Sequence, residues 1–293
     1  MSYQAHNVAR LHARDLIFFI RYLKEVVVNL DRSKSFLICN SYPKSGTHLL
    51  YQILYTIPGF LKWDDIVSVQ ALCGIMNTAS HIKWKLGSAP TNSIIRSHLT
   101  YCDEVLDVFK EHDCKTFFIY RDLRDVALSH ARWVCNEERI FLHELYLKHS
   151  SFDKKLMNSI KGVPLGTPFG SNASQPNIGE DFSRWLGWID DPNTIAIKFE
   201  DLVGERGGGC EETRLHLIEK ILAHLETNLS TQEIKAKFSS SGMNPRESHT
   251  FRKGAKGSKG GWKEAFTEAH KDAFKEVAGE LLIQLGYENN SNW

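Results

Sequence analysis

Short apolar runs alternate along this chain with longer segments in which apolar residues recur at helical spacing. Four short runs predict strands: Phe36–Cys39 and Thr116–Tyr120, which are expected to be buried, Ser93–Arg96, and Thr194–Phe199, in which Ile195 and Ile197 alternate with other residues. The helical spacing predicts helices at about 8–29, 47–57, 105–112, 123–135, 139–149, 182–189, 213–227, 231–238 and 267–285, the last followed by Gly286 as a stop signal.

Strands that alternate with helices indicate an α/β fold, with a central parallel sheet flanked by helices. No low-complexity tract divides the 293 residues, so we expect one domain, with the helix at about 8–29 packed on it. Residues 60–90 are less regular and are expected to form short helices and loops. The stretch 161–179 is rich in Gly, Pro, Ser and Asn and predicts a loop that acts as a lid, and 242–262 predicts a second long loop.

Composition excludes several functional classes. Lys and Arg number 36 against 35 Asp and Glu, and this balance argues against a nucleic-acid binder. The six cysteines form no C-x-x-C pair, which is typical of reduced thiols. The apolar stretch Leu16–Ile20 is too short to span a bilayer, so we expect a cytoplasmic protein that does not bind membranes. His143-Glu144 opens like H-E-x-x-H, but Leu147 stands at the second histidine, and no metal site is expected.

A turn after the first predicted strand carries the first candidate chemistry. It reads Tyr42-Pro43-Lys44-Ser45-Gly46-Thr47-His48 and leads into a helix, so backbone N–H groups, a helix dipole and a lysine point at one place. This P-loop-like arrangement suits a phosphate or a similar anion. A Walker A loop fits poorly, because Lys44 precedes Gly46. The alternative is an ordinary turn in which Ser45 caps the helix.

Two further segments suit anions. Arg121 follows the strand Thr116–Tyr120, and Ser129 lies about two helical turns further on. The alternative for this segment is a surface helix with a salt bridge between Arg124 and Asp125. Residues 252–263 hold five positive charges, four glycines and no acid, and are either an anion site or a solvated loop.

These three segments, in this order, resemble the cytosolic-type sulfotransferases. The matching patterns are Y-P-K-S-G-T, then R-D-x-x-D-V-x-x-S, then R-K-G followed by G-W-K-x-x-F-T, over about residues 36–267. The resemblance implies a sulfotransferase fold and the co-substrate 3′-phosphoadenosine 5′-phosphosulfate (PAPS), with 3′-phosphoadenosine 5′-phosphate (PAP) as its product. It implies no metal.

The resemblance also implies a role for each matching residue. His98, in Arg96-Ser97-His98-Leu99, matches the catalytic base, and neutral imidazole suits that task near pH 7. Lys44 and Arg96 are expected to stabilise charge on the leaving group. The remaining PAPS contacts are Ser45, Gly46, Thr47 and His48 around the phosphosulfate, Arg121 and Ser129 at the 3′-phosphate, Arg252, Lys253 and Gly254 closing over it, with Lys256 as a further candidate, Leu49 and Phe238 at the adenine, and Phe199 where the family has tyrosine.

The acceptor is expected to be a small molecule held by about 60–90, 133–149 and 161–182. Aromatic residues there suit phenols or steroids: Trp63, Trp84, Trp133, Phe141, Tyr146 and Phe169. Acidic residues suit a cation instead, such as a guanidinium toxin or another natural product: Asp64, Asp65, Glu137, Glu138, Glu180 and Asp181.

Two other functions stay open, a nucleotide-dependent kinase and a non-catalytic nucleotide-binding protein on the same fold. The family's dimer segment is poorly matched, because Glu268 replaces a valine and Asp272 a glutamate. We therefore expect a monomer or a weak homodimer.

Overall fold

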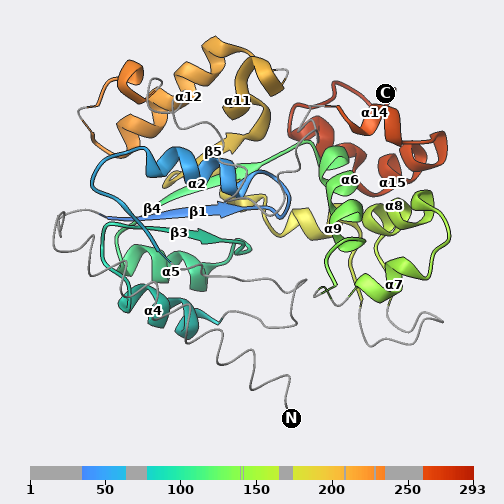
Figure 1. Cartoon of the computed structure of the whole chain (residues 1–293), viewed down its shortest axis with the longest axis horizontal. Coiled ribbons are helices and arrows are strands. Elements are labelled where there is room, and N and C mark those ends of the chain that lie inside the picture. The colour runs from blue at the N-terminus through green and yellow to red at the C-terminus, as the bar shows by residue number, and fades with distance from the viewer. Residues whose placement is uncertain are drawn as a thin grey trace.

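The computed structural model describes residues 35–63, 78–138, 140, 142–164, 174–207, 209–227, 229–234 and 260–293. Its centre is a sheet of five parallel strands in the order β2-β3-β1-β4-β5 (Figure 1). The strands are β1 (Phe36–Ser41), β2 (Leu61–Lys62), β3 (Ser93–Ser97), β4 (Cys114–Tyr120) and β5 (Thr194–Lys198). The predicted α/β fold is confirmed, and all four predicted strands are present.

Helices cover both faces of the sheet (Figure 1). One face carries α2 (Thr47–Tyr55), α11 (Phe199–Val203) and α12 (Glu211–His224), and the other carries α4 (Ala79–Gly87) and α5 (Asp103–Glu111). A block beyond the carboxyl ends of the strands contains α6 (Leu123–Val134), α7 (His143–Leu147), α8 (Phe152–Lys161), α9 (Ile178–Ser183), α14 (Trp262–Ala265) and α15 (Glu268–Gln284). The short helices α10 (Gly187–Asp190) and η1 (Gly204–Gly207) complete the described elements.

The two cores follow from the alternation of side chains along the strands. In β1, Phe36 and Ile38 face one apolar cluster, whereas Leu37 and Cys39 face the other. All four are at most 4% exposed, because helices cover both faces of the sheet. The buried strands hold the sheet in place, and with it the edge at which the predicted anion-binding residues follow β1, β3 and β4.

Three predicted elements differ from the structure. The expected helix at 182–189 is divided into α9 and α10, because the carbonyl of Arg184 accepts a hydrogen bond from the N–H of Tyr101. The expected helix at 139–149 is reduced to α7, and α8 had not been predicted. The irregular stretch 60–90 contains an edge strand, β2, as well as α4.

Other predictions fall partly or wholly outside the described residues. The helix at 8–29 lies outside them, and so does 165–173, the middle of the expected lid. The ends of that lid are ordered structure, since Val163 pairs with Gln175 and α9 begins at Ile178. In the described part of the chain, no helix is long and apolar enough to cross a bilayer. No cluster of metal-binding side chains occurs among those same residues.

Candidate active site

The lysine turn between β1 and α2 exposes the start of a helix. Gly46 is the N-cap of α2, and among the described residues no side chain caps the helix, so the alternative in which Ser45 caps it is wrong. Ser45 is fully buried, and within the described residues its hydroxyl has no hydrogen-bond partner. Lys44 adopts a left-handed backbone conformation with φ 70°, which costs energy in a non-glycine residue. Uncapped N–H groups and an unsatisfied hydroxyl make this turn suitable for an anion.

Two cations lie together at this turn. Desolvation and, to a smaller extent, the nearby charge of Arg121 together lower the pKa of Lys44 to about 8. The ammonium of Lys44 lies 4.8 Å from the centre of the Trp133 ring, an orientation that favours the charged form. Two neighbouring cations and the buried hydroxyl of Ser45 fit a ligand with more than one negative charge.

His98 is held in one tautomer at the end of β3. Its Nδ1 lies 2.8 Å from the carbonyl oxygen of Ser41 and 3.0 Å from the Ser41 hydroxyl. Because a carbonyl only accepts, Nδ1 carries the proton and Nε2 keeps its lone pair. Desolvation, helped by the charges of Arg96 and Lys44, lowers the pKa of His98 to about 4, although the hydrogen bond to the Ser41 carbonyl acts in the opposite direction. The ring is therefore neutral at pH 7 and able to accept a proton at Nε2.

Arg96 and His48 form a second fixed pair. The guanidinium of Arg96 donates to Nδ1 of His48 across 2.9 Å and lies 4.9 Å from the centre of the Tyr51 ring. Since arginine stays charged and only donates, His48 must be neutral and carry its proton on Nε2. The two histidines of the site thus hold opposite tautomers.

Phe199 joins the lysine turn to Arg121. Its ring is so close to Gly46 that a Cβ at position 46 would lie 2.5 Å from Cδ2 of Phe199. The guanidinium of Arg121 lies 4.5 Å from the centre of the same ring. The aromatic ring therefore brings the two predicted halves of the anion site together.

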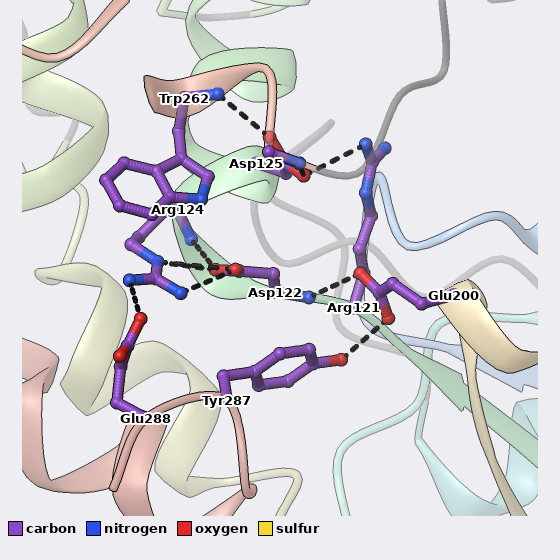
Figure 2. A network of polar contacts seen from close by, with 9 residues as sticks. Arg121, Asp122, Arg124, Asp125, Glu200, Trp262, Tyr287 and Glu288 are labelled. Atoms are coloured by element: carbon purple, nitrogen blue, oxygen red, sulfur yellow. Dashed lines mark hydrogen bonds and ion pairs between the residues drawn. The ribbon is translucent and has the colours of Figure 1, made fainter. Parts of the chain in front are cut away.

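The surface salt bridge between Arg124 and Asp125, an alternative considered from the sequence, does not occur. Arg124 and Asp125 are each 3% exposed, so they are not a surface salt bridge. Asp125 instead lies 3.4 Å from Arg121 and accepts a hydrogen bond from the N–H of Trp262 (Figure 2). It also accepts a hydrogen bond from the N–H of Gly260. Desolvation raises the pKa of Asp125, while the charge of Arg121 and the two N–H donors oppose that rise.

Arg124 belongs to a separate ion network beside this one. Its guanidinium pairs with Asp122 and Glu288 and is held between the rings of Trp262 and Trp293. Glu200 accepts from the N–H of Asp122 and from the hydroxyl of Tyr287 (Figure 2). The β4–α6 turn is thus tied to the C-terminal segment.

Of the remaining predicted PAPS contacts, three lie among the residues that the structure describes and the others lie outside them. Thr47 is buried and its hydroxyl bonds the Ser41 hydroxyl, Leu49 is buried in α2, and Ser129 is half-buried on α6. Phe238, Arg252, Lys253, Gly254 and Lys256 lie outside the described residues.

The predicted acceptor residues are more scattered. Trp133 lies under Lys44, but Tyr146 is fully buried and bonds Ser159 and Gln175, so it is a core residue. Asp181 accepts from the hydroxyl of Tyr42 and pairs with Arg184. Phe141, Phe169, Asp64 and Asp65 lie outside the described residues.

Sequence reasoning missed or undervalued three residues. Ser41 orients His98, and its place at the end of β1 was the available signal. Asp125 was read as a surface residue, although its spacing of four from Arg121 on a helix start allows contact. His130 was not assigned to the site, yet the charge of Lys44 helps burial to lower its pKa to about 4.

Comparisons with known proteins found a matching family model, related sequences and a similar fold. A family model described as "Sulfotransferase domain" matches residues 34–286. Flavonol 4′-sulfotransferase of Flaveria chlorifolia is 23% identical over 267 residues, which cover 84% of this chain and 78% of that protein. Sulfotransferase 2B1 of Mus musculus is 24% identical over 260 residues, covering 83% and 70% of the two chains.

One solved structure matches with a TM-score of 0.58. It is the mouse sulfotransferase SULT7A1 complexed with PAP, 19% identical, with 87% of this chain and 86% of that chain covered. At this identity the match shows a shared fold.

Proposed function

This chain belongs to the sulfotransferase family, and on that premise we propose that it transfers a sulfuryl group from PAPS to a hydroxyl or amine of a small molecule. PAPS, when bound, supplies the activated sulfuryl group and leaves as PAP. The observation that carries the proposal is the convergence of Lys44, Arg121 and the unsatisfied Ser45 hydroxyl at an uncapped helix start. These groups fit a nucleotide with anionic groups at both of its ends.

In this proposal the protein positions the nucleotide and neutralises its charge. Lys44, Ser45 and the first N–H groups of α2 bind the phosphosulfate side, together with Gly46, Thr47 and His48. Arg121 and Ser129 bind the 3′-phosphate, with Arg252, Lys253 and Gly254 completing that end. Phe199, Leu49 and Phe238 are the proposed apolar contacts.

The acceptor is deprotonated by His98. Its Nε2 lone pair takes the proton, because the Ser41 carbonyl holds the other ring proton on Nδ1. The charges of Lys44 and Arg96 stabilise the negative charge that develops on the leaving phosphate. No other proton acceptor is required for this step.

Neutral hydroxyl compounds are the first acceptors to test. The alternative, a guanidinium toxin or a related natural product, relies on acidic side chains, and Asp181 already pairs with Arg184. Trp133 beside Lys44 favours flat acceptors such as phenols.

Two measurements test the proposal. PAP should raise the melting temperature more than ADP or ATP at equal concentration, and a larger shift with ATP would favour the kinase alternative. Mass spectrometry of PAPS reactions with pooled alcohols, phenols and amines should then detect the gain of one sulfuryl group. His98→Ala should abolish that gain while PAP still stabilises the variant.

The location and the assembly stay predictions from the sequence. We propose a cytoplasmic monomer or weak homodimer that binds neither nucleic acid nor membranes. The Glu268 side chain is 83% exposed and pairs with Lys271, which agrees with a poorly matched dimer segment.

A further inference from the structure

Asp125 links the Arg121 side chain to a distant part of the chain. Its Oδ2 lies 3.4 Å from Nη2 of Arg121 and 2.9 Å from the N–H nitrogen of Gly260, and its Oδ1 lies 3.1 Å from the N–H nitrogen of Trp262. Figure 2 shows the Asp125 carboxylate between Trp262 and the Arg121 fork. One buried carboxylate thus joins the Arg121 side chain to the backbone of residues 260 and 262.

Each contact restrains Asp125 or Arg121 in a different direction. The N–H of Gly260 binds one carboxylate oxygen of Asp125 and the N–H of Trp262 binds the other, so both oxygens are fixed. These two donors lie 135 and 137 residues from Asp125 in the sequence. The carboxylate in turn holds one nitrogen of the Arg121 fork, whose central carbon also lies 4.5 Å from the centre of the Phe199 ring. A guanidinium carries five N–H donors, so an arginine held in this way still has donors for an anion.

The contact with Asp125 affects the orientation of the Arg121 guanidinium and also its attraction for an anion. A carboxylate beside Arg121 weakens its attraction for a phosphate, so a purely electrostatic anion site would lack Asp125. We therefore interpret the contact between Asp125 and Arg121 as one that orients the guanidinium, because bidentate recognition of a phosphate requires a guanidinium plane in a fixed orientation.

We propose that Asp125 is a positioning residue that aims the Arg121 fork at the 3′-phosphate of the bound nucleotide. The proposal rests on the proposed function, in which Arg121 contacts that phosphate. It assigns to Asp125 the selection of 3′-phosphorylated nucleotides over those that lack this group.

The test compares the affinities for PAP and for AMP, which differ only in the 3′-phosphate. The wild-type protein should bind PAP at least about tenfold more tightly than AMP. Asp125→Asn keeps the shape but not the charge, and should lower the ratio of the two affinities about tenfold, with AMP binding unchanged. Isothermal titration of each nucleotide gives the ratio per folded molecule.

Asp122→Asn is the matched control. Asp122 is buried in the same turn but pairs with Arg124, so this variant should lose stability and keep the ratio. In a double-mutant cycle with Arg121→Lys, Asp125→Asn should lower the ratio no further.

The outcomes separate the two hypotheses. A wild-type protein that does not prefer PAP contradicts the proposed function. A wild-type preference that Asp125→Asn leaves intact overturns the role of Asp125. If Asp125→Asn does not fold, Asp125→Glu decides, since its longer side chain shifts the carboxylate and should lower the ratio several-fold; an unchanged ratio there also overturns the proposal.

Discussion

At the scale of single residues, fixed hydrogen-bond partners decide what each side chain of the site can do. The Ser41 carbonyl leaves His98 with a basic Nε2, whereas Arg96 leaves His48 with a proton on Nε2. Nε2 of His98 is thus a hydrogen-bond acceptor, whereas Nε2 of His48 is a donor. The difference lies in residues 57 and 48 positions away in the sequence, so no local pattern could have revealed it.

Lys44 and His98 are expected to limit activity at opposite ends of the pH range. His98 acts as a base only when neutral, and with a pKa of about 4 it loses activity as the pH falls toward that value. Lys44 acts only when charged, and with a pKa of about 8 it loses activity as the pH rises through that value. The profile of kcat/KM should therefore be flat from about pH 5 to 7 and fall on both sides.

Lys44→Arg tests which group causes the fall of kcat/KM on the alkaline side of the pH profile, the alkaline limb, separately from the fall on the acid side, the acid limb. Arginine remains charged throughout, so the variant should keep the acid limb and lose the alkaline one, at reduced activity. The measurement needs an aliphatic alcohol as acceptor, because alcohols do not titrate between pH 4 and 10. An alkaline limb near pH 8 in the variant would show that another group causes it.

Gly46→Ala should distort the lysine turn. The residue has φ 106°, and a Cβ would lie 2.5 Å from the Phe199 ring, so the variant combines backbone strain with a collision. We expect a stability loss of about 1–3 kcal/mol and at least tenfold weaker PAP binding. Gly87→Ala is the control, since a Cβ at position 87 meets no atom of the described residues within 4 Å and the residue lies in α4. Equal PAP affinities in the two variants would contradict this role of Gly46.

At the scale of elements, the strands and the longer helices were predictable because their signals are local. Each predicted strand is a short, largely apolar run, and periodic spacing located α5, α6, α12 and α15 within a few residues. α8 had a signal that was not used, with Ser151 as N-cap and Leu156 and Ile160 four residues apart. The break between α9 and α10 had none, because a contact with Tyr101 causes it.

The packing of α9 on α15 can be tested with two glycines. A Cβ at Gly179 would lie 1.8 Å from the carbonyl oxygen of Val277, so Gly179→Ala must separate the helices and should cost about 2–4 kcal/mol. Apart from the backbone of its own helix, a Cβ at Gly279, inside α15, meets among the described residues only the Cβ of Lys275, at 3.8 Å. Gly279→Ala should therefore stabilise the protein by about 0.5–1 kcal/mol. Urea denaturation of both variants checks the expected opposite signs.

At the scale of the whole molecule, the site is built where distant segments meet. The turn at 42–47 and His98 come from the ends of two adjacent strands, and an α/β sheet predicts this proximity. The sequence did not predict that the β4–α6 turn is bound to residues beyond 260. Charged residues there suggested a solvated surface, because burial of Arg124 and Asp125 depends on partners that are far away in the chain.

Arg124 is expected to be essential for the fold and dispensable for selection of the nucleotide. It is 3% exposed, pairs with Asp122 and Glu288, and lies 3.9 Å from the centre of the Trp262 ring. Arg124→Met leaves a buried carboxylate without its partner, which should cost about 3–5 kcal/mol. In a chain of this size such a loss lowers the melting temperature by roughly 10 °C.

The matched comparison is a salt bridge at the surface. Lys83 and Glu111 are 2.6 Å apart with side chains about half exposed, so Lys83→Met should change stability by less than about 1 kcal/mol. Urea denaturation of both variants measures the contrast. The preference for PAP over AMP should survive in folded Arg124→Met, because Asp125 and not Arg124 contacts Arg121. Similar stabilities for the two methionine variants would show that the buried network does not bind the C-terminal segment to the sheet.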